Sequence, residues 1–97
     1  MGYANKARIQ NSIAIGANNT VAGNPAVAIG RDNNVSCVNG VSIGTLNTIS
    51  GTNAVAIGTM NNANGSYAIA MGGKARANSD GSFTWSGSNK VNVVVYP

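Results

Sequence analysis

Few residues in this sequence could carry out catalysis, and their spacing argues against it. The 97 residues include no histidine, and the only carboxylate side chains are those of Asp32 and Asp80. Histidine is the usual general base and the commonest metal ligand. A glycosidase-type site requires two carboxylates close together, whereas these two lie far apart in the chain. We therefore predict that the protein is not an enzyme and holds no cofactor and no metal ion.

Two further features resemble reactive sites but fall short of them. The stretch "GGKA" at residues 72–75 is not a phosphate-binding loop, because Ala68 and Ala75 stand where that loop has glycine and then serine or threonine. Cys37 is the single cysteine, so no disulfide can form within the chain. Neither feature predicts an activity.

The charged residues suggest a binding site instead. The formal net charge is +4, and Lys74, Arg76 and Lys90 lie toward the C-terminal end. We predict that these three contact an acidic glycan or another acidic ligand on a cell surface, although ordinary solubility charge explains them equally well. Nucleic acid is not an expected partner, because aromatic residues do not alternate with the basic ones. No apolar run approaches the roughly 18 residues of a membrane span, so no membrane insertion is expected.

A short repeat must position all of these residues. The pentapeptide "AVAIG" occurs at residues 26–30 and 54–58, with the variants "SIAIG" at 12–16, "GVSIG" at 40–44 and "AIAMG" at 68–72. Blocks of 14 residues starting at residues 12, 26, 40, 54, 68 and 82 align without gaps. A fixed short period is typical of solenoids, in which each repeat stacks on the next.

Each block contains two runs in which apolar residues alternate with others. Alternation with period two is typical of β-strands, and here it occupies block positions 1–4 and 9–12. In the second run we predict that positions 10 and 12, which include Val21, Val35 and Ile49, face the first strand across a thin core, and that the mostly polar residues at positions 9 and 11 face water. Glycine at position 5 and asparagine at position 8 are typical of the turn between the strands, because both tolerate positive φ. We predict an all-β fold, a two-sheet parallel β-solenoid with 14-residue coils stacked about 4.8 Å apart, forming a rod of roughly 30 Å.

The two faces of the first strand differ in side-chain size. Positions 2 and 4 carry large apolar residues, and we predict that they form the core of the coil: Val27, Val41, Val55, Ile15, Ile29, Ile43, Ile57, Met71 and Trp85. Positions 1 and 3 carry small residues, and we predict that they form a self-association face: Ala14, Ala28, Ser42, Ala54, Ala56, Ala68 and Ala70. The alternative is that small residues only relieve crowding on a tightly curved coil.

Three other positions have both a structural and a functional interpretation. The asparagines at position 8 could form a ligand platform, but turn geometry explains them and is preferred. Cys37 shares its block position with glycine and serine, which predicts a small core residue. Phe83 and Trp85 occupy the last block, where we expect an aromatic plug over the end of the stack rather than a carbohydrate-stacking site.

The pentapeptides "SIAIG", "AVAIG" and "AIAMG" at 14-residue spacing resemble the head repeats of YadA-like trimeric autotransporter adhesins. The resemblance implies a left-handed parallel β-roll and a homotrimer, in which the self-association face would be the trimer interface. We assign residues 1–87 to head repeats and residues 88–97 to a C-terminal extension or cap. After the repeats, "NKVNVVVYP" matches the neck of that family only in "VNV", and no heptads or barrel strands follow. The same repeat is also similar to parts of phage tail and fibre proteins.

We therefore expect a non-enzymatic trimeric attachment module at an extracellular surface. The favoured hypothesis is a phage tail-fibre or virion decoration protein that binds a host surface. The alternatives are the head of a bacterial trimeric autotransporter adhesin, located on the cell surface, and a purely structural spacer.

Overall fold

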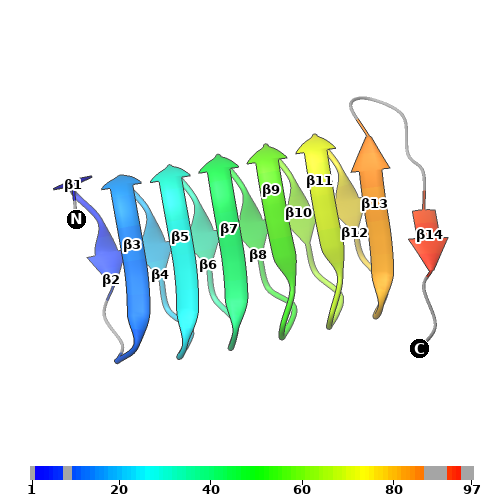
Figure 1. The fold of residues 1–97 in the computed structure, drawn as a ribbon, viewed down its shortest axis with the longest axis horizontal. Helices are drawn as coiled ribbons and strands as arrows, with labels where there is room; N and C mark the ends of the chain where they lie inside the picture. Colours follow the sequence, from blue (N-terminus) through cyan, green and yellow to red (C-terminus); the bar gives the residue numbers. More distant parts are fainter. Residues whose placement is uncertain (1, 8–9, 87–91, 95–97) are drawn as a thin grey trace.

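The protein forms a β-solenoid in which the repeats that start at residues 12, 26, 40, 54 and 68 each make one coil (Figure 1). A computed structural model describes residues 2–7, 10–86 and 92–94. Each complete coil contributes a long strand to an eight-stranded sheet and a two-residue strand to a six-stranded sheet. The molecule measures 34 × 25 × 14 Å, so it is a short, flat rod. The described part contains no helix that could cross a membrane.

The strands alternate between the two sheets along the chain. The long sheet contains β1 (Gly2–Tyr3), β3 (Ser12–Ala17), β5 (Ala26–Arg31), β7 (Gly40–Thr45), β9 (Val55–Thr59), β11 (Ile69–Gly73), β13 (Ser82–Ser86) and β14 (Asn92–Val94). The short sheet contains β2 (Lys6–Ala7), β4 (Thr20–Val21), β6 (Asn34–Val35), β8 (Thr48–Ile49), β10 (Asn62–Ala63) and β12 (Arg76–Ala77).

The pairing register follows the sequence repeat. Ile29 of β5 pairs with Ile15 on one side and with Ile43 on the other, in parallel strands, so neighbours in the sheet are 14 residues apart. The same offset holds along the short sheet, where Val35 pairs with Val21 and Ile49. The predicted period, strand order and two-sheet parallel solenoid are therefore confirmed.

The C-terminal end of the stack departs from the pattern of the repeat. β14 joins the long sheet, antiparallel to β13, with Val94 opposite Ser82. β12 is thus left as an edge strand of the short sheet. The hydroxyl of Thr84, which is fully buried, donates a hydrogen bond of 2.8 Å to the carbonyl of Arg76 in that edge strand. The Thr84 side chain thus satisfies a carbonyl of β12 on the side where no strand of the described part pairs with it.

The predicted assignment of inner and outer faces on the long strands was wrong. All residues predicted to form a trimer interface are buried inside the coil: Ala14, Ala28, Ser42, Ala54, Ala56, Ala68 and Ala70. The residues predicted as core point outward instead. Ile15 and Ile43 are each 38% exposed and Trp85 is 69% exposed, while the others are half-buried: Val27, Val41, Val55, Ile29, Ile57 and Met71. Trp85 therefore does not plug the end of the coil.

The thinness of the coil explains which face is inside. Val21, Val35 and Ile49 of the short strands are fully buried, as predicted, so the short sheet already supplies a branched side chain to the interior. Two tight turns hold the sheets so close that the facing long strand can add only small side chains, such as Ala28 and Ala56. Because strand side chains alternate, placing the small set inside turns the whole large set outward.

Cys37 illustrates how little space the interior has. Its side chain is buried, as predicted for a small core residue, and this burial raises the pKa of the thiol above its ordinary value. A Cβ added to Gly40 would overlap the Cys37 sulfur. In the next coil, Gly51 stands where Cys37 does and Ala54 stands where Gly40 does. The larger Cys37 is therefore combined with glycine, and the smaller Gly51 with alanine.

Candidate self-association surface

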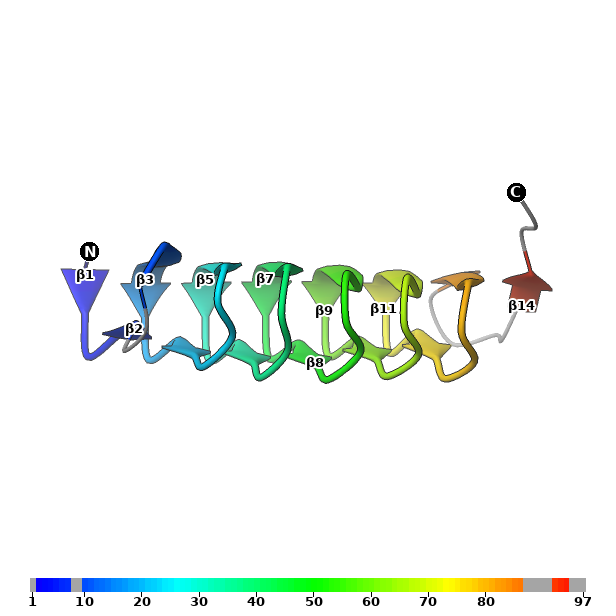
Figure 2. The same ribbon diagram turned by 90° about the horizontal axis from the view of Figure 1, so that it is seen from below.

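The outer side of the long sheet carries a continuous set of large apolar side chains. We call it the apolar face, and its two columns are Ile13, Val27, Val41, Val55, Ile69, Phe83 and Ile15, Ile29, Ile43, Ile57, Met71, Trp85. The register of the strands aligns each column along the rod. Figure 2 shows the short sheet against one side of the long sheet only, so the apolar face lies on the side away from it.

The apolar face has the properties of an interface. Ile13 is 47% exposed and Trp85 is 69% exposed, and neither column contains a charged residue. Burying a Val or Ile side chain completely stabilises by about 1.5–3 kcal/mol relative to exposure. Side chains that are only half covered leave much of that stabilisation to be gained in a contact with another surface. A contiguous apolar patch of this kind marks an interaction site.

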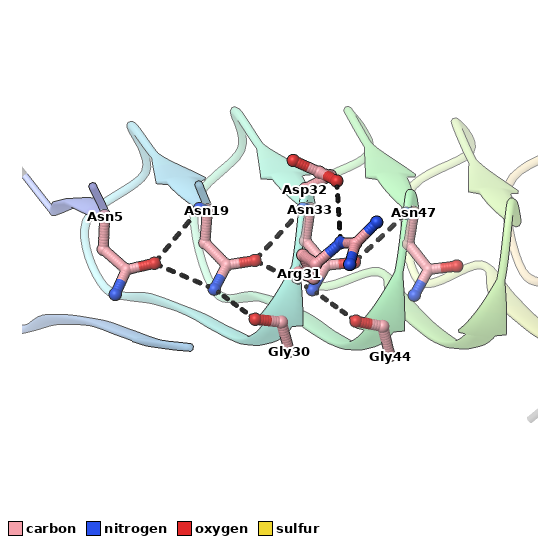
Figure 3. Close-up of polar contacts among 8 residues, drawn as sticks. All are labelled: Asn5, Asn19, Gly30, Arg31, Asp32, Asn33, Gly44 and Asn47. Atoms are coloured by element: carbon pink, nitrogen blue, oxygen red, sulfur yellow. Dashed lines mark hydrogen bonds and ion pairs between the residues drawn. The ribbon is translucent and has the colours of Figure 1, made fainter. Parts of the chain in front are cut away.

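A buried ladder of asparagines supports the turn after each long strand (Figure 3). Asn19, Asn33, Asn47 and Asn61 are at most 1% exposed. The side-chain amide of Asn33 donates hydrogen bonds to the carbonyl of Ile29, at 3.1 Å, and to that of Gly44 in the next coil, at 3.0 Å. Its oxygen accepts a bond of 3.1 Å from the backbone amide of Asn47. Each asparagine thus joins its own turn to the next coil.

The ladder confirms the preference for a turn role over a ligand platform, because these side chains are buried. The predicted reason was wrong, however. The residues with positive φ are those one position earlier, such as Asn18 and Asp32, and not the buried asparagines. Asparagine is required for its two amide hydrogens and its acceptor oxygen. The sequence signal was present as a column of asparagines, but only the structure shows the direction of the side chains.

The glycine column is needed for the same turn. Gly30 has a φ of 127°, which residues with a side chain rarely adopt. A Cβ at this position would also overlap the carbonyl oxygen of Gly44 in the next coil. The close approach of successive backbones therefore excludes any side chain, and it exposes the glycine carbonyl to the asparagine amide.

The basic residues lie away from the apolar face. Lys74 lies in the turn before β12, and Arg76 lies on the outer side of β12; both are exposed. The third predicted contact, Lys90, lies outside the described residues. Lys6 is at the opposite end of the short sheet. Among the described residues, no group of three or more His, Cys, Asp or Glu side chains could hold a metal ion.

Comparison with known protein families identifies the family to which the chain belongs. A model of the YadA head domain repeat, which describes two copies of that repeat, matches residues 1–19, 10–33, 50–75 and 63–83. Together the matches cover residues 1–33 and 50–83, more than half of the chain. The chain belongs to the YadA head repeat family. No curated protein and no solved structure matches it.

YadA heads are structural repeats of adhesins, exposed at the cell surface, and the family is trimeric. The matches leave out residues 34–49, which include Cys37 and Gly40. The solenoid nevertheless continues through this segment without a change of register, because Val41 pairs with Val27 and Val55. Membership of the YadA head family therefore agrees with the architecture of the whole stack.

Proposed function

We propose that the chain is a non-enzymatic attachment module that works as a homotrimer, with the apolar face as its subunit interface. The observation that carries this proposal is the uninterrupted pair of apolar columns on the open side of the long sheet. Its side chains belong to every coil from β3 to β13, so the contact would extend along the rod.

Three parallel rods can bury this face completely in a closed, symmetric trimer. If each subunit turns its apolar face toward a common threefold axis, all the columns become buried and no apolar face remains open. The short sheets then form the outer surface. Their outward residues are polar, as predicted, and Asn34, Ser36, Thr48 and Ser50 are all exposed. A trimer of this kind presents each ligand contact three times, so weak contacts can combine.

The oligomeric state tests this interface. Ile57→Asp should place a charge in each subunit contact and convert the trimer into folded monomers, because Ile57 lies outside the coil and is not needed to fill it. Light scattering coupled to size exclusion measures the mass, and circular dichroism measures the strand content. The matched control is Thr48→Asp, on the exposed side of the short sheet. A trimer that survives Ile57→Asp would refute the apolar face as the interface.

We further propose that Lys74 and Arg76 contribute to binding an acidic glycan or an acidic envelope group. Both side chains are exposed and neighbour each other at one end of the rod, and the chain carries a net positive charge. Binding through them should weaken as salt rises. Retention on an acidic glycan resin is the measurement, with Lys74→Ser and Arg76→Ser combined in one variant and Lys6→Ser as the control. If the double variant is retained as strongly as wild type, the site is excluded.

The family match favours a bacterial adhesin head as the carrier of this module. A phage tail fibre or virion decoration protein is the alternative, and a spacer without a receptor is the third. An anchor domain in the same polypeptide would identify the adhesin, and tail genes encoded beside it would identify the fibre. Failure to bind whole cells or acidic glycan would favour the spacer.

A further inference from the structure

The turn after the long strands contains a second unusual column of residues. We call Ala4, Asn18, Asp32, Leu46, Met60 and Lys74 the turn column, because they occupy the same place in successive coils. All six have left-handed backbones, with φ between 57° and 60°. Asparagine and aspartate tolerate this conformation, whereas it costs other residues with a side chain roughly 1–2 kcal/mol. Leu46 and Met60 are therefore unfavourable where Asn18 and Asp32 are not.

Burial within the chain does not compensate for this strain. Leu46 is 50% exposed and Met60 is 48% exposed. They lie in adjacent coils, whose strands β7 and β9 are paired, so the two side chains form one exposed apolar pair. Strained residues that gain little from their own fold point to a function in contact with something else.

The charges beside this pair follow a simple order. Residues 33–73 contain no charged side chain, and the turn column has Asp32 on one side of the pair and Lys74 on the other. Along the rod, the column therefore reads negative, apolar, apolar, positive. Figure 1 shows the carboxyl ends of the long strands lined up along one edge of the sheet, so the turns that follow them form a row.

We propose that this row binds the same row of a second copy of the chain, in antiparallel orientation. A twofold axis between Leu46 and Met60 would place Leu46 against Met60 of the partner subunit and Asp32 against Lys74 of the partner subunit. Both copies share the coil spacing of about 4.8 Å, so all four contacts form together. Such a contact is isologous and buries an apolar centre between two ion pairs.

The charges select this orientation and this partner. A parallel arrangement would bring Asp32 against another Asp32 and Lys74 against another Lys74, which is repulsive. Asp32 already has a contact of 3.3 Å with Arg31, but the Arg31 side chain is 70% exposed, so that ion pair is weak and leaves the carboxylate able to accept a second donor. The proposal concerns the edge of the rod and goes beyond the subunit contacts of the apolar face, because it joins one assembled module to another.

The apolar pair can be tested without harming the fold. Leu46→Asn combined with Met60→Asn places asparagine at both positions, as at Asn18 in the same column. The backbone strain should therefore fall, and the stability of the fold should rise. Sedimentation of the wild type over a range of concentrations should show species heavier than the basal oligomer. In the double variant their association should weaken at least ~10-fold, while the basal oligomer persists.

Three results would overturn the proposal. The wild type could show no species above the basal oligomer at any concentration, or the heavier species could persist unchanged in the double variant. The double variant could instead break the basal oligomer, which would place the turn column inside the subunit interface. Ile57→Asp tests the basal oligomer separately, so failure of the trimer and failure of this contact give different results.

A charge exchange tests the antiparallel orientation. Asp32→Lys alone and Lys74→Asp alone should each abolish the heavier species, because each variant places like charges opposite each other. Mixing the two single variants should restore association. One chain then carries lysine at both positions 32 and 74, and these face the aspartates at positions 74 and 32 of the other chain. Association by either variant alone, or none in the mixture, would contradict the antiparallel contact.

Discussion

The asparagine ladder leads to a prediction whose size can be worked out from the structure. In Asn47→Ala, the amide loses hydrogen bonds to the carbonyls of Ile43 and Gly58, each 3.1 Å long. Asn61 loses the acceptor of its backbone amide, at 2.9 Å. Three bonds at about 0.5–1.5 kcal/mol each, together with buried groups left without partners, give an expected loss of about 3 kcal/mol in the free energy of unfolding.

The matched control is Asn34→Ala, which removes an amide from the exposed side of the short sheet. A change within about 0.5 kcal/mol is expected there. Urea unfolding followed by circular dichroism measures both variants, at one fixed protein concentration because oligomer dissociation contributes to the apparent stability. A loss below about 1 kcal/mol for Asn47→Ala, or equal losses in the two variants, would show that water can replace the ladder and that our reasoning is incorrect.

Two further predictions concern the narrow interior. The hydroxyl of Ser42 is buried without a hydrogen-bond partner, between Ala28 and Ala56. Ser42→Ala should therefore raise the free energy of unfolding by roughly 1 kcal/mol, measured as a higher melting temperature. A clear loss of stability would refute this account of the site. Gly40→Ala should destabilise by several kcal/mol, because its methyl group overlaps the Cys37 sulfur, and adding Cys37→Gly should recover much of that loss. Additive losses in the double variant would show that the two sites do not share one space.

Local patterns in the sequence were sufficient to predict the architecture. The 14-residue period, the alternation within each block and the glycine at its fifth position predicted the coil length, the parallel register and the place of the turn. These features follow from strand geometry and backbone sterics, which act within a few residues. The buried Val21, Val35 and Ile49 of the short strands were also predicted correctly. The division into residues 1–87 and 88–97 stays a prediction.

The inner face of the long strand could be decided only by the tertiary structure. Alternation shows that Ala56 and Ile57 face opposite sides, but it does not show which side is enclosed. That depends on the distance between the sheets, which the two turns and the asparagine ladder set across successive coils. The gap admits alanine and excludes isoleucine, so the large residues point outward, where a separate surface must bury them. The usual association of large apolar side chains with the core of a single chain therefore fails in this thin coil.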